Sequence, residues 1–176
     1  RDVKLSESRI AGYRNFATKL WNASKFLEIN NCKLRDDFDP RKVKNSINIW
    51  IISQLEITTE KVGNSIKSYR FNDAADSIYK FIWNSYCDWY LELIKPSIQK
   101  DNTDIEENEM RETANWVLCQ ANSLLNPFMP YITETLNEKL FKSKDMLIRS
   151  SWPSLNILND SLNANTEIVF LINILT

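Results

Sequence analysis

The sequence predicts an all-α protein, a bundle of about five helices with a short C-terminal extension. Few residues favour turns, because the 176 residues include only two Gly and five Pro. Apolar residues make up 43% of the chain and charged residues 26%, which is the composition of a folded domain and not of a disordered segment. Most apolar residues recur at spacings of three and four, the period of an amphipathic helix. A chain of this length can bury the core of one domain.

The first predicted helix covers Ser6–Asn30. Its apolar stripe is predicted to face the core and consists of Ile10, Tyr13, Ala17, Leu20, Ser24 and Leu27. A polar segment then interrupts the pattern, and within it Asp39 can cap a helical turn that begins at Pro40. The second helix is therefore predicted to begin between Pro40 and Ser46, and its periodic run extends to Tyr69.

The third predicted helix follows Asn72, a residue type that caps helices well, and ends at Lys95-Pro96, because the residue before a proline avoids helical geometry. One apolar stripe consists of Ala75, Ile78, Ile82, Tyr86, Trp89 and Leu93, and it is broadened by Tyr79, Trp83, Tyr90 and Ile94. A helix that is apolar over most of its circumference is predicted to lie in the middle of the bundle. Its aromatic residues can stack on nucleobases, but their spacing favours packing in the core.

An exposed acidic connection, Gln99–Asn108, is predicted to lead into a fourth helix over Met110–Leu125. Pro130 can open a fifth helix, which extends to Leu140. The sequence then takes on an extended style and ends in an apolar run. We therefore place the helical domain at residues 1–145 and the beginning of a further C-terminal region at residues 146–176.

The absence of histidine limits the chemistry that the chain can perform. It removes the commonest general base, the usual Ser-His and Cys-His nucleophile pairs and most zinc sites, so we expect no catalytic and no metal site. Cys32, Cys87 and Cys119 are expected to be free thiols that pack as apolar groups. No apolar run is long enough to span a membrane, and the N-terminal residues lack the apolar core of a signal peptide, so we expect a cytoplasmic protein.

Two carboxylates, Asp88 and Glu92, lie four residues apart and hence on one face of the third helix. This spacing occurs in acid/base pairs and metal sites. Without histidine and without a third acid in register, a structural role is favoured, such as an ion pair within the bundle. Lys95 follows Glu92 by three residues and is an available partner.

The first helix carries an unusual polar face. Residues 1–44 hold eleven Lys or Arg against six Asp or Glu, a balance of +5 in a chain whose net charge is −1. At about 100° per residue, one face of the helix gathers Asn15, Lys19, Asn22 and Phe26. Amides that read base edges, a cation for phosphate and a ring for stacking are the groups that recognise unstacked RNA bases. An ordinary solvent-exposed face has the same composition, so both interpretations stay open here.

Four motifs resemble a known family. They are Y-R-N-F-A-T-K-L-W-N-A-S-K-F (Tyr13–Phe26), W-I-I-S-Q-L (Trp50–Leu55), Y-R-F-N-D-A-A-D-S-I-Y-K-F-I-W-N-S-Y-C-D-W-Y-L-E-L-I-K-P (Tyr69–Pro96) and L-L-N-P-F-M-P-Y-I-T-E (Leu124–Glu134). Over residues 9 to 153 the chain resembles the anticodon-binding helical domain of class I aminoacyl-tRNA synthetases. Among these it is most similar to the valyl-tRNA synthetase family.

This resemblance implies a helical bundle that receives the anticodon loop of the tRNA for valine. It also implies a parent enzyme that activates valine with ATP and Mg and transfers it to the tRNA. The family's ATP-site signatures, H-I-G-H and K-M-S-K-S, do not occur in this sequence. The chain is therefore expected to bind tRNA as a monomer, without catalysis or a cofactor of its own.

The resemblance places RNA against the first helix. The hypothesis is that Phe26 stacks on a splayed anticodon base, while base-edge or phosphate contacts come from Lys25, Asn22, Lys19 and Asn15. Arg9 and Arg14 are second-choice contacts, because either can pair with acids in the bundle. Lys25 stands where the family commonly has Arg, so a bidentate contact is not expected there. The alternatives are a helical protein-interaction or scaffold domain and the anticodon domain of a sister enzyme for isoleucine or leucine.

Overall fold

The computed structural model describes residues 6–98, 105–141, 145–155 and 157, and the side chain of Arg9 is not among the groups it describes. Its α-helices are α1 (Glu7–Ile29), α2 (Ser46–Lys67), α3 (Phe71–Lys80), α4 (Leu91–Ile98), α5 (Ile105–Leu125) and α6 (Pro130–Lys139). A π-helical stretch, η2 (Phe81–Tyr90), joins α3 to α4 into one continuous rod. Short 3-10 turns form η1 (Pro40–Lys42) and η3 (Leu147–Arg149). The predicted all-α bundle of about five helices is thus confirmed over the described residues, which contain no strand.

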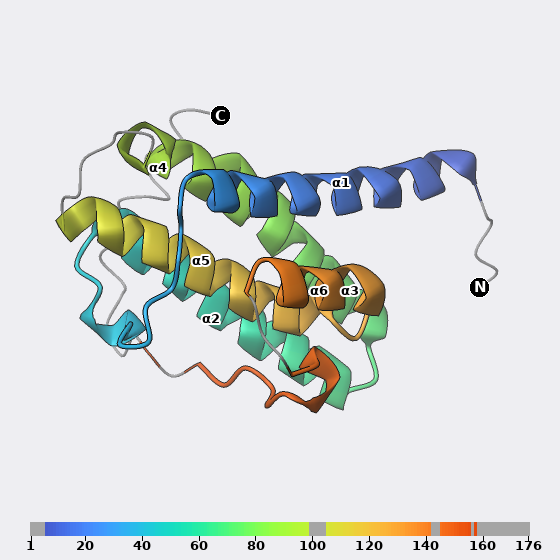
Figure 1. Cartoon of the computed structure of the whole chain (residues 1–176). Coiled ribbons are helices and arrows are strands. Elements are labelled where there is room, and N and C mark those ends of the chain that lie inside the picture. The colour runs from blue at the N-terminus through green and yellow to red at the C-terminus, as the bar shows by residue number, and fades with distance from the viewer. Residues whose placement is uncertain (1–5, 99–104, 142–144, 156, 158–176) are drawn as a thin grey trace, which may run out of the picture.

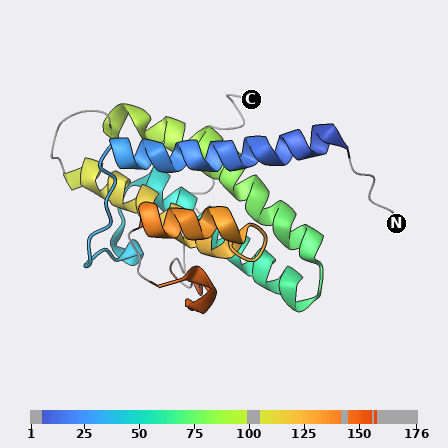
Figure 2. The same cartoon turned by 45° about the vertical axis from the view of Figure 1, so that its right-hand side comes forward.

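Helix α1 lies along one side of the bundle, and its N-terminal turns project beyond the other helices (Figures 1 and 2). From Phe16 onward it buries an apolar face that includes Leu20 and Leu27. Ile10 and Tyr13, which were predicted to face the core, are instead 52% and 66% exposed. The stripe has the right period there, but no neighbouring helix extends far enough to cover it.

The start of α2 depends on a side-chain cap. The Asn45 side chain accepts a hydrogen bond from the backbone N–H of Ile47 (3.0 Å), so the helix begins at Ser46, the later end of the predicted range. Asp39 does cap a helical turn, because it accepts from the N–H of Arg41 (3.1 Å), but that turn is only the short η1.

The reversal between α2 and α3 corrects one prediction. Tyr69 adopts a left-handed backbone conformation (φ 58°), and the N–H of Arg70 returns to the carbonyl of Ser65 (2.8 Å). Because the chain turns within these residues, α3 begins already at Phe71, and Asn72 is not its N-cap. The prediction that Asn72 caps this helix was wrong, because the backbone turn at Tyr69 determines where the helix starts.

Two further predicted boundaries are wrong. Helix α4 continues through Pro96 to Ile98, because Ile94 and Ile98 are buried and their packing outweighs the hydrogen bond that proline lacks. Helix α5 begins at Ile105, so the last four residues of the predicted connection are helical, with acidic side chains near the positive helix end. The rest of that connection lies outside the described residues.

The rod α3–η2–α4 occupies the middle of the bundle, as predicted. Buried side chains recur at every fourth position, namely Ala74, Ile78, Ile82, Tyr86, Tyr90, Ile94 and Ile98. A strict four-residue stripe would wind around an α-helix, which has 3.6 residues per turn, and the wider π turn keeps it on one side. Trp83 and Trp89 are half-buried and pack against the core. Two predicted core positions differ: Leu93 is exposed, and Ala74 is fully buried where Ala75 was predicted to be.

The buried tyrosines of η2 hold the bundle together through hydrogen bonds. The Tyr90 hydroxyl donates to Asn48 Oδ1 (2.8 Å), and Asn48 Nδ2 donates to Glu109 Oε1 (3.0 Å). Glu109 also accepts from the N–H of Asn45 (2.9 Å) at the start of α2. The Tyr86 hydroxyl donates to a backbone carbonyl of α5 (2.8 Å). These bonds connect η2, α2 and α5 through groups that would be costly to leave unpaired.

Tyr90→Phe should therefore destabilise the protein more than its small size change suggests. Removing the hydroxyl leaves the buried Asn48 oxygen without its donor, which costs about 1 to 3 kcal/mol. Tyr131→Phe is the matched control, because Tyr131 is 90% exposed and should change little. Chemical denaturation of both variants measures the difference. Equal midpoints would contradict the structural role of the Tyr90 hydroxyl.

The three free thiols should react slowly and with a shifted pH dependence. Burial raises the pKa of Cys32 and of Cys87 to about 12, and that of the half-buried Cys119 to about 11. A raised pKa lowers the thiolate fraction. At pH 8 roughly one Cys119 side chain in a thousand is ionised, which is a far smaller fraction than for a free thiol of pKa about 8.5. Alkylation at Cys119 should accelerate about tenfold per pH unit up to pH 10 and be much faster in denaturant. A rate that levels off near pH 8.5 in the folded protein would contradict this.

Candidate functional site

The side of α1 opposite the core forms an exposed ridge. We define the α1 ridge by its outward residues Arg14, Asn15, Thr18, Asn22, Lys25 and Ile29, all of which are exposed. Four of the predicted contact residues therefore lie together on one accessible surface. Its amides and cations face solvent, while Phe16, Leu20 and Leu27 on the other side hold the helix in place.

A hollow of about 180 Å³ lies beside the ridge, between α1 and the rod η2–α4. Lys19, Asn22 and Phe26 line its α1 side, and Cys87, Leu91 and Glu92 line the other side. The structure thus brings three predicted contact residues together at one edge of the ridge. Phe26 is half-buried and packs against the core, so its ring forms a fixed wall of this hollow.

Lys19 is already engaged within the bundle. It forms an ion pair with Asp88, and its ammonium nitrogen lies 4.0 Å from the centroid of the Trp83 ring. Glu92 pairs with Lys95 at 3.2 Å. Each carboxylate thus forms an ion pair, as expected, although both side chains are exposed and each pairs with a different lysine. Lys19 is consequently better placed to fix the edge of the ridge than to reach outward.

The opposite edge of the ridge was not found from the sequence. There Trp21 and Lys25 of α1 meet Lys139 of α6, around a small hollow. Lys25 also pairs with Glu28 at 2.6 Å. The spacing of Trp21 and Lys25 on one side of a helix was available in the sequence, but the arrival of Lys139 from another helix could not be read from a helical period.

The remaining two predicted contacts, Arg14 and Arg9, both lie in the N-terminal half of α1. Arg14 is exposed on the ridge, and its backbone carbonyl accepts a hydrogen bond from the Thr18 hydroxyl (3.0 Å). Arg9 belongs to the projecting N-terminal part of α1, and its side chain lies outside the described groups.

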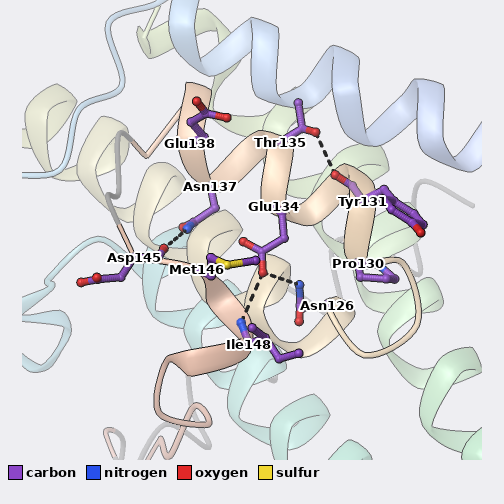
Figure 3. A pocket seen from close by; sticks show the side chains of 10 residues that line it. All are labelled: Asn126, Pro130, Tyr131, Glu134, Thr135, Asn137, Glu138, Asp145, Met146 and Ile148. Carbon is purple, nitrogen blue, oxygen red and sulfur yellow. Dashed lines mark hydrogen bonds between the residues drawn. The ribbon is translucent and has the colours of Figure 1, made fainter.

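Another hollow, of about 880 Å³, lies between α6 and residues 145–148, and several of the polar side chains that line it form hydrogen bonds within the protein. Figure 3 shows Glu134 between the two segments, where it accepts from the N–H groups of Leu147 (3.0 Å) and Ile148 (3.3 Å). Asn137 donates to the carbonyl of Asp145 (2.8 Å). These bonds hold the segment after α6 against the bundle, so this hollow does not compete with the ridge as a candidate site.

Comparison with known sequences identifies the family. Residues 48–175 match the anticodon-binding domain of tRNA ligase, which is more than half of the chain. The chain belongs to this family of anticodon-binding domains. The matched range begins within α2, so the domain match itself does not include α1.

Among the similar proteins are valine–tRNA ligases, and some of these matches extend over the whole chain, α1 included. The chain is 47% identical to the enzyme of Bartonella quintana (strain Toulouse) over 180 residues, covering 100% of this chain and 20% of the relative. It is 48% identical to that of Bradyrhizobium diazoefficiens over 153 residues (87% and 16%), and 43% identical to that of Caulobacter vibrioides over 176 residues (98% and 19%). The anticodon-binding chain thus spans about a fifth of the length of these relatives.

Over the residues that the structure describes, no helix combines the length and apolar character needed to cross a membrane. Within the same residues, no three Cys, Asp or Glu side chains converge as ligands for a metal ion.

Proposed function

We propose that this chain is the anticodon-reading part of a valine–tRNA ligase and that it binds the anticodon loop of the tRNA for valine. The observation that carries the proposal is the exposed α1 ridge, with its amides and cations, on a domain of the anticodon-binding family. The identity of 47% to a valine–tRNA ligase over the whole chain supports valine as the amino acid.

In this proposal the α1 ridge reads the bases and holds the backbone of the loop. Asn22 and Asn15 offer amide groups that can donate to and accept from base edges. Lys25 and Arg14 offer cations to phosphates, with Arg9 as a further candidate. Phe26 offers its ring for stacking on a splayed base, and Lys19, held by its ion pair with Asp88, lines the same hollow.

The expected specificity follows from the genetic code. Valine codons begin with G-U, so the matching anticodons share A in the middle and C at the third position, while their first base varies. A surface that reads two bases and tolerates the third is therefore sufficient. Direct contacts with A and C through hydrogen bonds would supply the discrimination.

The catalytic steps belong to the rest of the proposed enzyme. Activation of valine with ATP and Mg requires the H-I-G-H and K-M-S-K-S signatures, and this chain contains neither. We propose that the chain contributes tRNA binding to a cytoplasmic enzyme, because translation takes place in the cytoplasm. A monomeric state, and a boundary between a helical domain of residues 1–145 and a further region of residues 146–176, stay predictions.

A binding experiment tests the proposal. The chain should bind a valine anticodon stem-loop more tightly than the same loop with the middle A replaced, at one fixed salt concentration. Asn22→Ala should reduce this preference about tenfold, since a good base contact contributes about 1 to 3 kcal/mol of discrimination. Asn64→Ala is the matched control, because Asn64 is exposed on α2, away from the ridge. Equal binding to both loops would contradict anticodon reading and favour a scaffold domain, and preference for another tRNA would favour a sister synthetase.

Phe26→Leu tests the stacking contact separately from the fold. Truncation to Ala would also remove core packing, because Phe26 is half-buried, whereas Leu keeps an apolar side chain in the hollow. We expect Phe26→Leu to weaken binding of the matched loop about tenfold, since stacking of a base on an aromatic ring contributes about 1 to 3 kcal/mol. Thermal unfolding should shift little. Unchanged affinity would show that the ring serves packing alone.

A further inference from the structure

Two lysines from different helices lie near one tryptophan ring. The ammonium nitrogens of Lys25 on α1 and Lys139 on α6 lie 5.8 and 5.9 Å from the centroid of the Trp21 ring. Trp21 is half-buried and packs against the core, so the ring is a fixed platform. Attraction of a cation to an indole face favours keeping both charges at this ring.

The Trp21 platform continues into a groove of about 580 Å³ between the C-terminal end of α1, α5 and α6. Lys139 and Glu28 line both the hollow at Trp21 and this groove. Lys33 is exposed and also lines the groove. We call the surface formed by Trp21, Lys25, Lys33 and Lys139 the α1–α6 seam.

The charges of the seam do not cancel. Glu28 is the acid that lines both hollows, and it pairs with Lys25 at 2.6 Å. Three lysines therefore face one carboxylate. Like charges gathered on one surface repel each other, and an anion bound there would relieve the repulsion.

We infer that the α1–α6 seam is a second RNA contact that binds the phosphodiester backbone of the loop whose bases the α1 ridge reads. This inference rests on the proposed function and deepens it. Lysine donates hydrogen bonds and accepts none, which suits phosphate oxygens. Trp21 is half-buried and two lysines already lie near its ring. In this inference the ring therefore orients the lysines and does not stack on bases.

The observations favour RNA over an acidic protein segment as the ligand. Lys25 belongs to both the α1 ridge and the seam, so the two surfaces are continuous. One loop can therefore place its bases against Asn22 and its phosphates against Lys25 and Lys139. Lys139 is exposed at the end of α6 and can reach outward.

Lys139→Gln tests the seam in the complete 176-residue chain. We expect binding to weaken about three- to tenfold for both the matched and the middle-base-changed stem-loop, so that the preference between the loops is unchanged. The slope of log affinity against log salt should fall by about 0.7, the value for one phosphate contact with a single strand. Lys61→Gln is the matched control, because Lys61 is exposed on α2, and it should change neither quantity.

The outcomes separate this inference from the proposed function. If the wild-type chain prefers the matched loop but Lys139→Gln behaves like Lys61→Gln, the seam inference is overturned and the ridge stands. If the wild-type chain prefers neither loop, the proposed function fails and the seam inference fails with it. Tighter binding of a polyglutamate peptide than of the matched loop, lost in Lys139→Gln, would assign the seam to an acidic protein partner and overturn the inference. Unchanged thermal unfolding of the variant shows that a lost contact is the cause.

Discussion

The bundle depends on a buried polar connection at its centre. The rod through η2 buries an apolar face in the core, yet the hydroxyls of Tyr86 and Tyr90 on that face are buried and need hydrogen-bond partners. Tyr90 meets this need through Asn48, which Glu109 in turn holds. Because each group has a fixed geometry, the bonds set the register of three helices that apolar packing alone would specify less sharply. The same carboxylate accepts a hydrogen bond from the N–H of Asn45, the residue that caps α2, so the network also helps to fix where that helix starts.

The position of α5 also determines the orientation of α1, whose outward face is the surface that we propose for RNA. Asn115 of α5 donates to the backbone carbonyl of Cys32 (2.6 Å), and Glu112 pairs with Arg35. Burial raises the pKa of Glu112, while the nearby guanidinium of Arg35 opposes the rise. These contacts hold the chain directly after α1, so the orientation of that helix is fixed at its C-terminal end. The α1 ridge is thus a rigid surface rather than a loop, which suits recognition of bases by short side chains.

The helices could be predicted from the sequence because burial of one face sets the period of their apolar residues. Burial of these apolar faces also stabilises most of the helices. Their ends were less predictable. Pro96 lies inside α4 because packing overrides a local signal, and α3 starts early because Tyr69 takes a left-handed turn. A period also cannot show whether a neighbour exists, as exposed Tyr13 illustrates. The same limit applies to the site. Asn22 could be placed on the ridge from one helix alone, whereas Lys139 reaches the seam only through tertiary packing.

In the function that we propose, the outward face of α1, supported by this bundle, receives the anticodon loop. Mapping backbone amide chemical shifts by NMR, with and without a valine anticodon stem-loop, tests it most directly because every described element reports at once. We expect the largest changes along α1 around Asn22 and Lys25 and at the end of α6, with little change at the α2–α3 turn. Changes centred on that turn, around Tyr69 and Phe71, with α1 unaffected, would contradict it.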